Sequence, residues 1–265
     1  MKQIQTGFPL TGLCDIVSHA HTTGSTNTDA RELITLHPDA DTILRTADTQ
    51  TGGRGRQGKS FASPEGGLYM TLVLKTDTPL SSVVNVTSCA AVAVARALAS
   101  FGVECGIKWV NDIYRNGRKL AGILVESIND YETMRSRYLI LGIGVNVKHN
   151  IFPAGIEAVT LEEEGFSIAP AELCAAIVRE LLAVRDAGFD FSQYAEEYRR
   201  RSIVLGQEVF FLRNGETMTG TAESIDDRGG LNVRVGKILH TLDSGEITLR
   251  VIRSFSEIDK RSEPI

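Results

Sequence analysis

The chain carries the sequence KWVNDIYRNGRKLAGILVE at residues 108–126, in which two β-prone runs flank Asn116-Gly117. An Asn-Gly pair favours a two-residue hairpin turn, because the type I′ turn needs positive φ at both positions. Such a turn pairs Asp112 with Ala121 and places Asp112 and Lys119 on one face of the hairpin. A regular strand would bring Lys108, at the start of the run, to the same face.

Further elements are predicted on both sides of this hairpin. A helix is expected from Ser25-Thr26-Asn27, which are preferred N-cap types, to Leu36 before Pro38. Glycines within the apolar run Tyr138–Val147 indicate a close approach of a ligand or of another backbone segment. The remaining predicted elements are a strand at Tyr69–Lys75 and helices at Ser88–Ser100, Pro170–Arg185 and Asp190–Arg201.

The character of the chain changes at about residue 202. Five short β-prone runs separated by turn residues follow within a short stretch, which is typical of a small barrel. We therefore expect a domain of residues 1–202 and a second domain of residues 203–265 with a polar tail. The five runs are Gln207–Leu212, Thr217–Ile225, Leu231–Val235, Ile238–Leu242 and Glu246–Ile252.

A second informative stretch is TGGRGRQGKS at residues 51–60. Its glycines allow close approach of the backbone to a ligand, and its arginines and lysine can bind carboxylate or phosphate. Gly53–Ser60 also satisfies the G-x-x-x-x-G-K-S spacing of a nucleotide-binding P-loop. However, a P-loop opens a helix, whereas Pro64 and two glycines follow here, so we expect this match to be incidental.

Composition excludes several classes of protein. The chain has 265 residues and a formal net charge of −5, which does not favour non-specific binding of nucleic acid. Its four cysteines are widely spaced and form no C-x-x-C pair, which argues against a zinc site or a disulfide framework and for a reducing, cytoplasmic setting. We find no secretory signal and no apolar run that is long enough to span a bilayer.

The order of these segments resembles the biotin protein ligases. The GRGR loop, the KW-x-ND…KLAGIL segment and the run LGIGVNV carry the resemblance, which extends over nearly the whole chain. It implies an α+β fold in which a mixed sheet with flanking helices, as in class II aminoacyl-tRNA synthetases, precedes an SH3-like barrel. It also implies a reaction in which biotin and ATP form biotinyl-5′-adenylate, which a lysine of a biotin carboxyl carrier protein then attacks.

Other functions remain open at this point. A lipoate–protein ligase or another carboxylate-adenylating enzyme could use the related fold. A ligand sensor or DNA-binding regulator is a second class. Too few residues precede Ser25 for a helix-turn-helix domain, so we expect a monofunctional ligase that does not bind DNA or a membrane. The resemblance further implies ATP and Mg²⁺ as cofactors and an acceptor in acetyl-CoA carboxylase or a relative, and a homodimer is possible.

The resemblance assigns site residues, and their chemistry suits the reaction. Adenylation places negative charge on phosphate oxygens, so its site needs fixed cations and donors. A ureido ring offers one acceptor and two donors, which hydroxyls and amides match. The predicted biotin-binding residues are Ser25, Thr26, Asn27, Gln50, Arg54, Gly55, Arg56, Lys119 and Gly122; the ATP-binding residues are Arg54, Arg56, Lys59, Asn111, Lys119 and Asn146; and the catalytic residues are Arg56, Lys119 and Asp112.

Expectations for three further positions, Asp112, Trp109 and Ala158, concern the acceptor lysine, the core and the adenine. Asp112 is the candidate to accept the proton of the incoming lysine, since only the neutral amine is nucleophilic. We interpret Trp109 as a core residue rather than a ligand contact. Some relatives carry a tryptophan that stacks on adenine where this chain has Ala158, so other residues must pack against the adenine.

Overall fold

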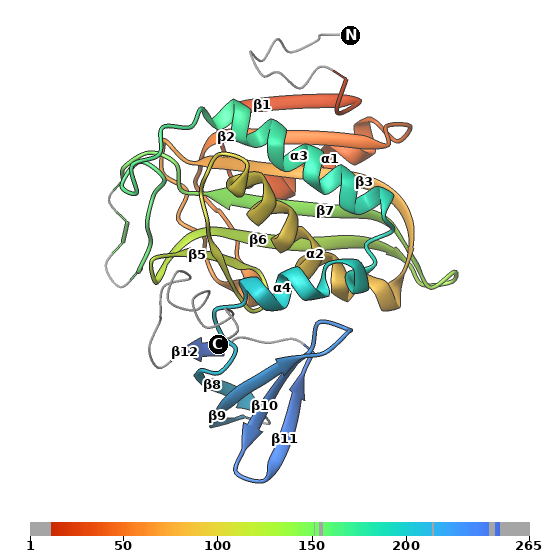
Figure 1. Ribbon diagram of the computed structural model, residues 1–265. Helices are drawn as coiled ribbons and strands as arrows, with labels where there is room; N and C mark the ends of the chain where they lie inside the picture. Colours follow the sequence, from red (N-terminus) through yellow and green to blue (C-terminus); the bar gives the residue numbers. More distant parts are fainter. Residues whose placement is uncertain (1–11, 151, 154–155, 214, 244–246, 250–265) are drawn as a thin grey trace.

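A seven-stranded sheet forms the centre of the larger part of the chain (Figure 1). The computed structural model describes residues 12–150, 152–153, 156–213, 215–243 and 247–249. β1 and β2 run parallel, whereas the other neighbours are antiparallel, so the predicted mixed sheet is confirmed. In spatial order the strands are β1 (Ile16–Thr23), β2 (Thr42–Gln50), β3 (Leu68–Pro79), β7 (Arg135–Val145), β6 (Arg118–Asp130), β5 (Asp112–Arg115) and β4 (Gly106–Lys108).

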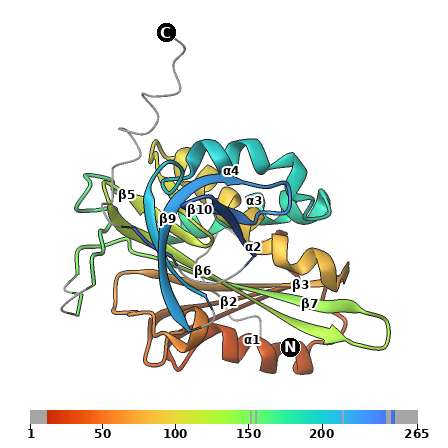
Figure 2. The same ribbon diagram turned by 90° about the horizontal axis from the view of Figure 1, so that it is seen from below.

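Helices cover both faces of this sheet. Figure 2 shows α1 (Thr26–Leu36) on one face and the other long helices on the opposite face. The second face carries α2 (Leu80–Ala99), α3 (Pro170–Asp186) and the shorter α4 (Ala195–Arg201). Helix α2 begins eight residues before the predicted start at Ser88, directly after Pro79, which acts as its N-cap residue. The predicted Asp190–Arg201 helix is divided into a 3₁₀ turn, Phe191–Gln193, and α4.

Helix α2 is apolar because it lies in the core. By length and composition alone it could cross a membrane, so the prediction that no run is long enough was wrong. However, 61% of its most apolar window is buried, and it packs between the sheet and α3. Its alanines permit this close packing, and Ala90, Ala93 and Ala97 have at most 1% exposure.

Strand β7 presents different residues to the two faces of the sheet. Leu139, Leu141 and Val145 belong to the main core on the α2 side. Ile140 instead packs in the small cluster under α1. Successive side chains of a strand point to opposite faces, so Gly142 and Gly144 lie on the same face as Ile140, toward α1. Because they have no side chains, they leave this face of the sheet open. The opening for a ligand therefore lies on the α1 side of the sheet.

The 108–126 hairpin differs from the prediction in two respects. Lys108 ends β4, a turn follows, and β5 then pairs back on β4, so the run is not one continuous strand. A bulge also shifts the register between Ile113 and Tyr114, and Asp112 lies opposite Gly122 rather than Ala121. The residue that the bulge inserts is Leu120, which is fully buried, so packing of its side chain accounts for the shift.

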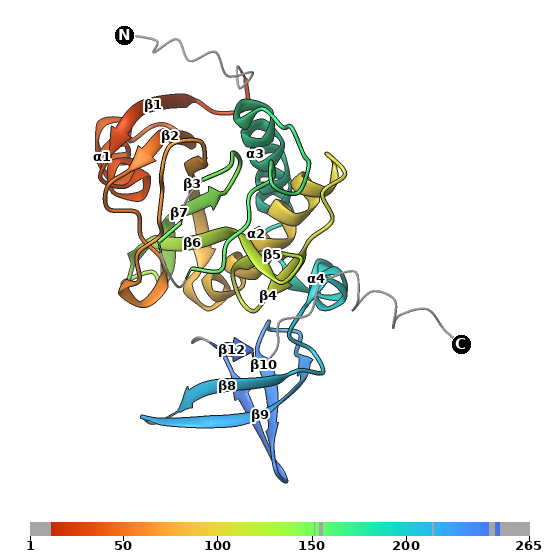
Figure 3. The ribbon, with the colours of Figure 1, turned by 90° about the vertical axis from the view of Figure 1, so that its left-hand side faces the viewer.

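The C-terminal part forms a separate five-stranded antiparallel sheet (Figure 3). Its strands are in the order β11-β10-β9-β8-β12, and the side chain of Phe211 on β8 reaches His240 on β11, with 6.0 Å between ring centres. The sheet is therefore curled, as a small SH3-like fold requires. The strands are β8 (Glu208–Arg213), β9 (Glu216–Ile225), β10 (Leu231–Val235), β11 (Ile238–Leu242) and β12 (Ile247–Leu249); the predicted residues Glu246 and 250–252 lie outside the described part.

All four cysteines are free, as the sequence predicts. Burial raises the pKa of the Cys14, Cys89, Cys105 and Cys174 thiols to about 12. A thiol with so high a pKa carries almost no thiolate at neutral pH and is a poor nucleophile or metal ligand. These side chains therefore act as small apolar residues.

Candidate functional site

A pocket with a cavity of about 140 Å³ opens on the α1 side of the large sheet. It brings together the start of α1, the 51–60 loop, the turn after β4, and the central strands β6 and β7. Nearly every predicted site residue lies in its wall. The predicted residues that line it are Ser25, Thr26, Asn27, Gln50, Arg54, Gly55, Arg56, Lys59, Asn111, Asp112, Lys119 and Gly122.

Glycines on neighbouring strands form the floor of the pocket. Gly122 on β6 lies opposite Gly144 on β7, and the ring of Phe61 rests over both of them. A Cβ at Gly144 would lie 2.4 Å from Phe61 Cε1, and a Cβ at Gly122 would lie 3.0 Å from Phe61 Cε2. No other residue type could occupy Gly144 without displacing the ring, which explains the glycines within apolar strands.

One end of the pocket is neutral and polar. Ser25 is the N-cap residue of α1, but its hydroxyl makes no capping hydrogen bond. Thr26 donates both its backbone N–H and its hydroxyl to Gln50 Oε1, at 2.9 and 3.1 Å. Gln50 Nε2 in turn donates to Ser63 Oγ at 2.8 Å. The residues that the sequence indicated as helix caps are therefore turned toward the pocket wall.

The other end of the pocket is cationic. Among the described lining residues the cations are Arg54, Arg56, Lys59, Lys108 and Lys119, and Asp112 is the one carboxylate. Such an excess of fixed positive charge attracts a polyanion, because partly buried charges are weakly screened.

Lys119 and Asp112 meet in this cationic end, as predicted. Lys119 Nζ lies 2.7 Å from Asp112 Oδ1 and 5.5 Å from the centre of the Phe61 ring. The Oδ1 atom is buried, so little solvent screens this ion pair. Arg56 donates to Asn111 Oδ1 at 3.5 Å, which connects the loop to the turn after β4.

The 51–60 loop does not open a helix. It closes on itself through a bridge between Arg54 and Ser60, contains a short 3₁₀ turn at Arg56–Gly58, and leads into β3. At Gly53 a Cβ would lie 2.4 Å from the carbonyl oxygen of Phe61, so this glycine serves a tight backbone crossing. The P-loop spacing is therefore incidental, as expected.

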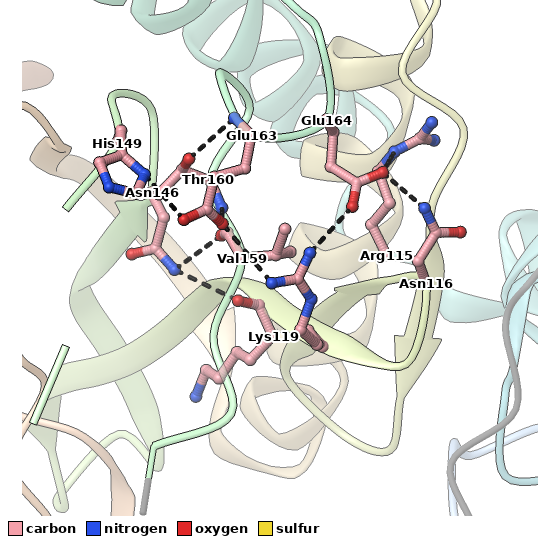
Figure 4. A network of polar contacts seen from close by, with 10 residues as sticks. Arg115, Asn116, Lys119, Asn146, His149, Val159, Thr160, Glu163 and Glu164 are labelled. Atoms are coloured by element: carbon pink, nitrogen blue, oxygen red, sulfur yellow. Dashed lines mark hydrogen bonds and ion pairs between the residues drawn. The ribbon is translucent and has the colours of Figure 1, made fainter. Parts of the chain in front are cut away.

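Asn146 is the predicted site residue that lies outside the pocket lining. It is 5% exposed, and its Nδ2 donates to the carbonyl oxygens of Lys119 and Val159, each at 3.2 Å. Figure 4 shows these bonds, with the amine of Lys119 pointing away from them. Asn146 thus joins the segment around Val159 to β6, and its contact with a nucleotide stays a prediction.

Several lining residues were not among the predicted site residues. Phe61 follows the glycine-rich loop directly, and Lys108 lies in a cationic segment, so local sequence offered a signal for both. Ile247 belongs to β12 of the second sheet, and no local signal points to it. Trp109 is 3% exposed and donates through Nε1 to the Gly229 carbonyl at 2.9 Å, which confirms its core role although it also borders the pocket.

Comparison with known proteins agrees with this geometry. Residues 20–146 match the model of the Biotin/lipoate A/B protein ligase family, and residues 204–250 match that of the biotin protein ligase C terminal domain. The Biotin–[acetyl-CoA-carboxylase] ligase of Mycobacterium tuberculosis is 31% identical over 237 residues, which cover 85% of this chain and 85% of that protein. The bifunctional ligase/repressor BirA of Bacillus spizizenii is 31% identical over 235 residues, which cover 85% of this chain and 71% of that protein.

A solved structure extends the likeness to three dimensions. The biotin protein ligase from Aquifex aeolicus in complex with biotin and ATP has a TM-score of 0.71 and 25% identity, and the match covers 89% of this chain and 99% of that one. The mixed sheet, the flanking helices and the second, curled sheet are thus shared with a ligase. On sequence and fold together, this chain belongs to the biotin protein ligase family.

Proposed function

We propose that this pocket catalyses both steps of an ATP-dependent biotin protein ligase. In the first step a carboxylate oxygen of biotin attacks the α-phosphorus of ATP, which gives biotinyl-5′-AMP and releases pyrophosphate. In the second step the ε-amine of an acceptor lysine attacks the activated carbonyl carbon, which forms an amide and releases AMP. The proposal rests chiefly on one observation, that a neutral polar end and a cationic end share one pocket.

The neutral end suits the ureido ring of biotin. Hydroxyls and side-chain amides of Ser25, Thr26, Asn27 and Gln50 can donate to its carbonyl and accept from its N–H groups. The Phe61 ring, which rests on the glycine floor, offers an apolar surface in the pocket for the apolar part of the ligand. A binding site of this kind orients the biotin carboxylate toward the cations.

The cationic end suits the phosphates. Arg54, Arg56 and Lys59 come from a loop whose glycines let it lie close to a ligand, and Lys119 comes from the rigid strand β6. As the α-phosphate gains charge in the transition state, these donors stabilise it without reorganisation of solvent. We assign Lys119 to the biotin carboxylate and the α-phosphate, and Arg56 to closure over the adenylate.

Asp112 is suited to the second step. Its buried Oδ1 lies 2.7 Å from Lys119 Nζ, and a carboxylate oxygen can accept a further hydrogen bond beside this ion pair. A carboxylate in this position can take a proton from the acceptor ammonium and leave the neutral amine to attack.

Magnesium would be carried by the nucleotide. The described residues contain no cluster of three or more His, Cys, Asp and Glu side chains. Mg²⁺ commonly binds through one or two carboxylates together with substrate phosphates, and the oxygens of Asn111 and Asp112 fit that pattern. When bound, the ion would neutralise part of the phosphate charge.

The remaining assignments concern the setting of the reaction. We propose a catalytic domain of residues 1–202, a second domain of residues 203–265, and an acceptor that is a biotin carboxyl carrier protein in a reducing, cytoplasmic compartment. Strand β1 lies at one edge of the large sheet and pairs with β2 on one side. Main-chain pairing at such an edge is a docking mode for an acceptor strand or for a second copy of this chain.

Exchange of labelled pyrophosphate into ATP tests the function. Purified protein is assayed with biotin, lipoate and octanoate side by side, because all three are carboxylates that related folds could activate. We expect exchange with biotin alone. Exchange that depends on lipoate and not on biotin would overturn the proposal.

A further inference from the structure

Glu126 is a carboxylate on β6 that lies beside the polar end of the pocket without lining it. Its Oε2 accepts a hydrogen bond from Asn27 Nδ2 at 2.8 Å and lies 3.3 Å from an Nη atom of Arg54. Its Oε1 lies 3.4 Å from an Nη atom of Arg31 on α1. The side chain is 22% exposed, so these contacts are only partly screened by solvent.

Asn27 is held at both ends of its amide. The residue is 4% exposed, and its Oδ1 accepts from Thr71 Oγ1 at 2.7 Å. Gly142 makes room for it, since a Cβ there would lie 2.2 Å from Asn27 Oδ1. The position of the amide is therefore fixed by its neighbours. Two orientations fit this position, one with Oδ1 toward Thr71 and one with Nδ2 toward Thr71.

Glu126 decides that orientation. The hydroxyl of Thr71 can donate or accept, and it also lies 2.8 Å from Thr26 Oγ1, so it tolerates either end of the amide. A carboxylate only accepts, so it selects the Nδ2 end. With Nδ2 directed to Glu126, Asn27 Oδ1 lies against Gly142 at the pocket floor, where it can accept a hydrogen bond from a ligand N–H.

The same carboxylate also connects the floor to the glycine-rich loop. Arg54 belongs to that loop, and its ion pair with Glu126 joins the loop to β6. Arg31, from the exposed side of α1, contributes a further positive charge. Glu126 thus lies where the amide of Asn27 and the loop meet.

We propose that Glu126 is a positioning residue for ligand recognition, which acts through the amide of Asn27. It touches no substrate itself. By directing Nδ2 away from the pocket it presents Oδ1 to an N–H of the biotin ureido ring. This inference rests on the proposed function, because a ureido N–H is the donor that Oδ1 would recognise.

A double-mutant cycle tests the inference with biotin binding as the readout. Affinity for biotin without ATP is measured by calorimetry for wild type, Glu126→Leu, Asn27→Ala and the double variant. We expect each single change to weaken binding about tenfold or more, and the double variant to bind as weakly as Asn27→Ala alone. Additive losses in the double variant would overturn the inference.

Further variants distinguish a positioning role of Glu126 from a purely structural one. Glu126→Gln keeps an oxygen that can accept from Asn27, so it should recover most of the affinity, whereas failure of this rescue would count against the proposed role. If Glu126→Leu does not fold, Glu126→Ala with Asn27→Ala supplies the cycle. Asp130→Asn removes a carboxylate from the same strand, where its partner is Arg137, and should leave the affinity for biotin unchanged.

The two proposals fail in different ways. If wild type neither binds biotin nor exchanges pyrophosphate with it, the proposed function is wrong. If wild type does both and the cycle is additive, only the role of Glu126 is wrong. In addition, KM for ATP should change less than KM for biotin in Glu126→Leu, and equal changes in both would contradict action through Asn27.

Discussion

Lys119 combines a rigid backbone with a side chain that enters the cationic end of the pocket. Its carbonyl accepts from Val159 N–H and from Asn146 Nδ2, and its Nζ pairs with Asp112. For Lys119→Gln we expect kcat/KM for adenylate formation to fall about 10²- to 10³-fold, because one fixed charge on the α-phosphate is lost. Pyrophosphate exchange measures this effect.

Two further lysine variants serve as controls for Lys119→Gln. Lys148→Gln makes the same chemical change outside this pocket and should have little effect. Lys119→Arg keeps the charge and should retain part of the activity. Unchanged exchange in Lys119→Gln would refute the assigned contact.

Gly144 provides a second test at the scale of single residues, because a Cβ there would collide with Phe61. We expect Gly144→Ala to weaken biotin binding about tenfold, since overpacking of this kind costs about 1–3 kcal/mol. Calorimetry with biotin measures the loss. Gly24→Ala adds a methyl group where nothing lies within 4 Å and is the matched control.

The role of the Phe61 ring can be isolated in the same experiment. If the collision with Phe61 causes the loss, Gly144→Ala should cost less affinity in a Phe61→Leu background than in the wild-type chain. The same loss in both backgrounds would show that Phe61 is not the residue displaced.

At the scale of elements, hydrogen bonds to Asp15 connect the start of β1 to the start of β2. Its Oδ2 accepts the N–H groups of Asp41 and Thr42 at 2.9 Å each and the Thr42 hydroxyl at 3.0 Å. The backbone N–H of Thr42, together with the other bonds, lowers the pKa of Asp15 below its ordinary value. The strand that leads to Ser25 therefore depends on an ionised carboxylate.

The direction of the Asp15 pKa shift determines how the stabilisation by these hydrogen bonds depends on pH. Because the pKa is lower in the folded state, the stabilisation is complete above the unfolded-state pKa, about 3.9, and is lost as pH falls through the folded-state value. We expect Asp15→Asn to lower the urea midpoint at pH 7, and the difference from wild type to shrink below about pH 4. A difference that does not change with pH would contradict this account.

At the scale of the whole molecule, the two sheets meet beside the pocket. Trp109 donates to the Gly229 carbonyl at 2.9 Å, and Ile247 of β12 reaches the pocket wall. For Trp109→Phe we expect a loss of about 1–3 kcal/mol of unfolding free energy, because a buried carbonyl loses its partner. Urea unfolding followed by circular dichroism measures it, and wild-type stability would refute the contact.

Local patterns predicted most of this architecture. The Asn116-Gly117 turn, the apolar run of β7 and the five C-terminal runs each depend on neighbouring residues, so these strands could be located from sequence, whereas β1 and β2 were not predicted. The site loop and the hairpin were recognisable because their residue types are unusual at such density.

Other features could not be predicted, because they depend on distant parts of the chain. The bulge that moves Asp112 opposite Gly122 arises from burial of Leu120 in the core. The approach of Ile247 to the pocket depends on how the second sheet docks. Glu126 ends the run KLAGILVE as an ordinary polar residue, and only the fold places it beside Asn27, 99 residues earlier.

Three of the four cysteines are buried and Cys14 is partly buried, which makes the chain well suited to site-specific labelling. Ser60 lies exposed on the loop, and Ser60→Cys would introduce a thiol of ordinary acidity among thiols whose pKa is about 12. At neutral pH that thiol would carry on the order of a thousandfold more thiolate than the native ones. A maleimide dye would then attach at one position, and its emission would follow the loop in real time as ligands bind and leave.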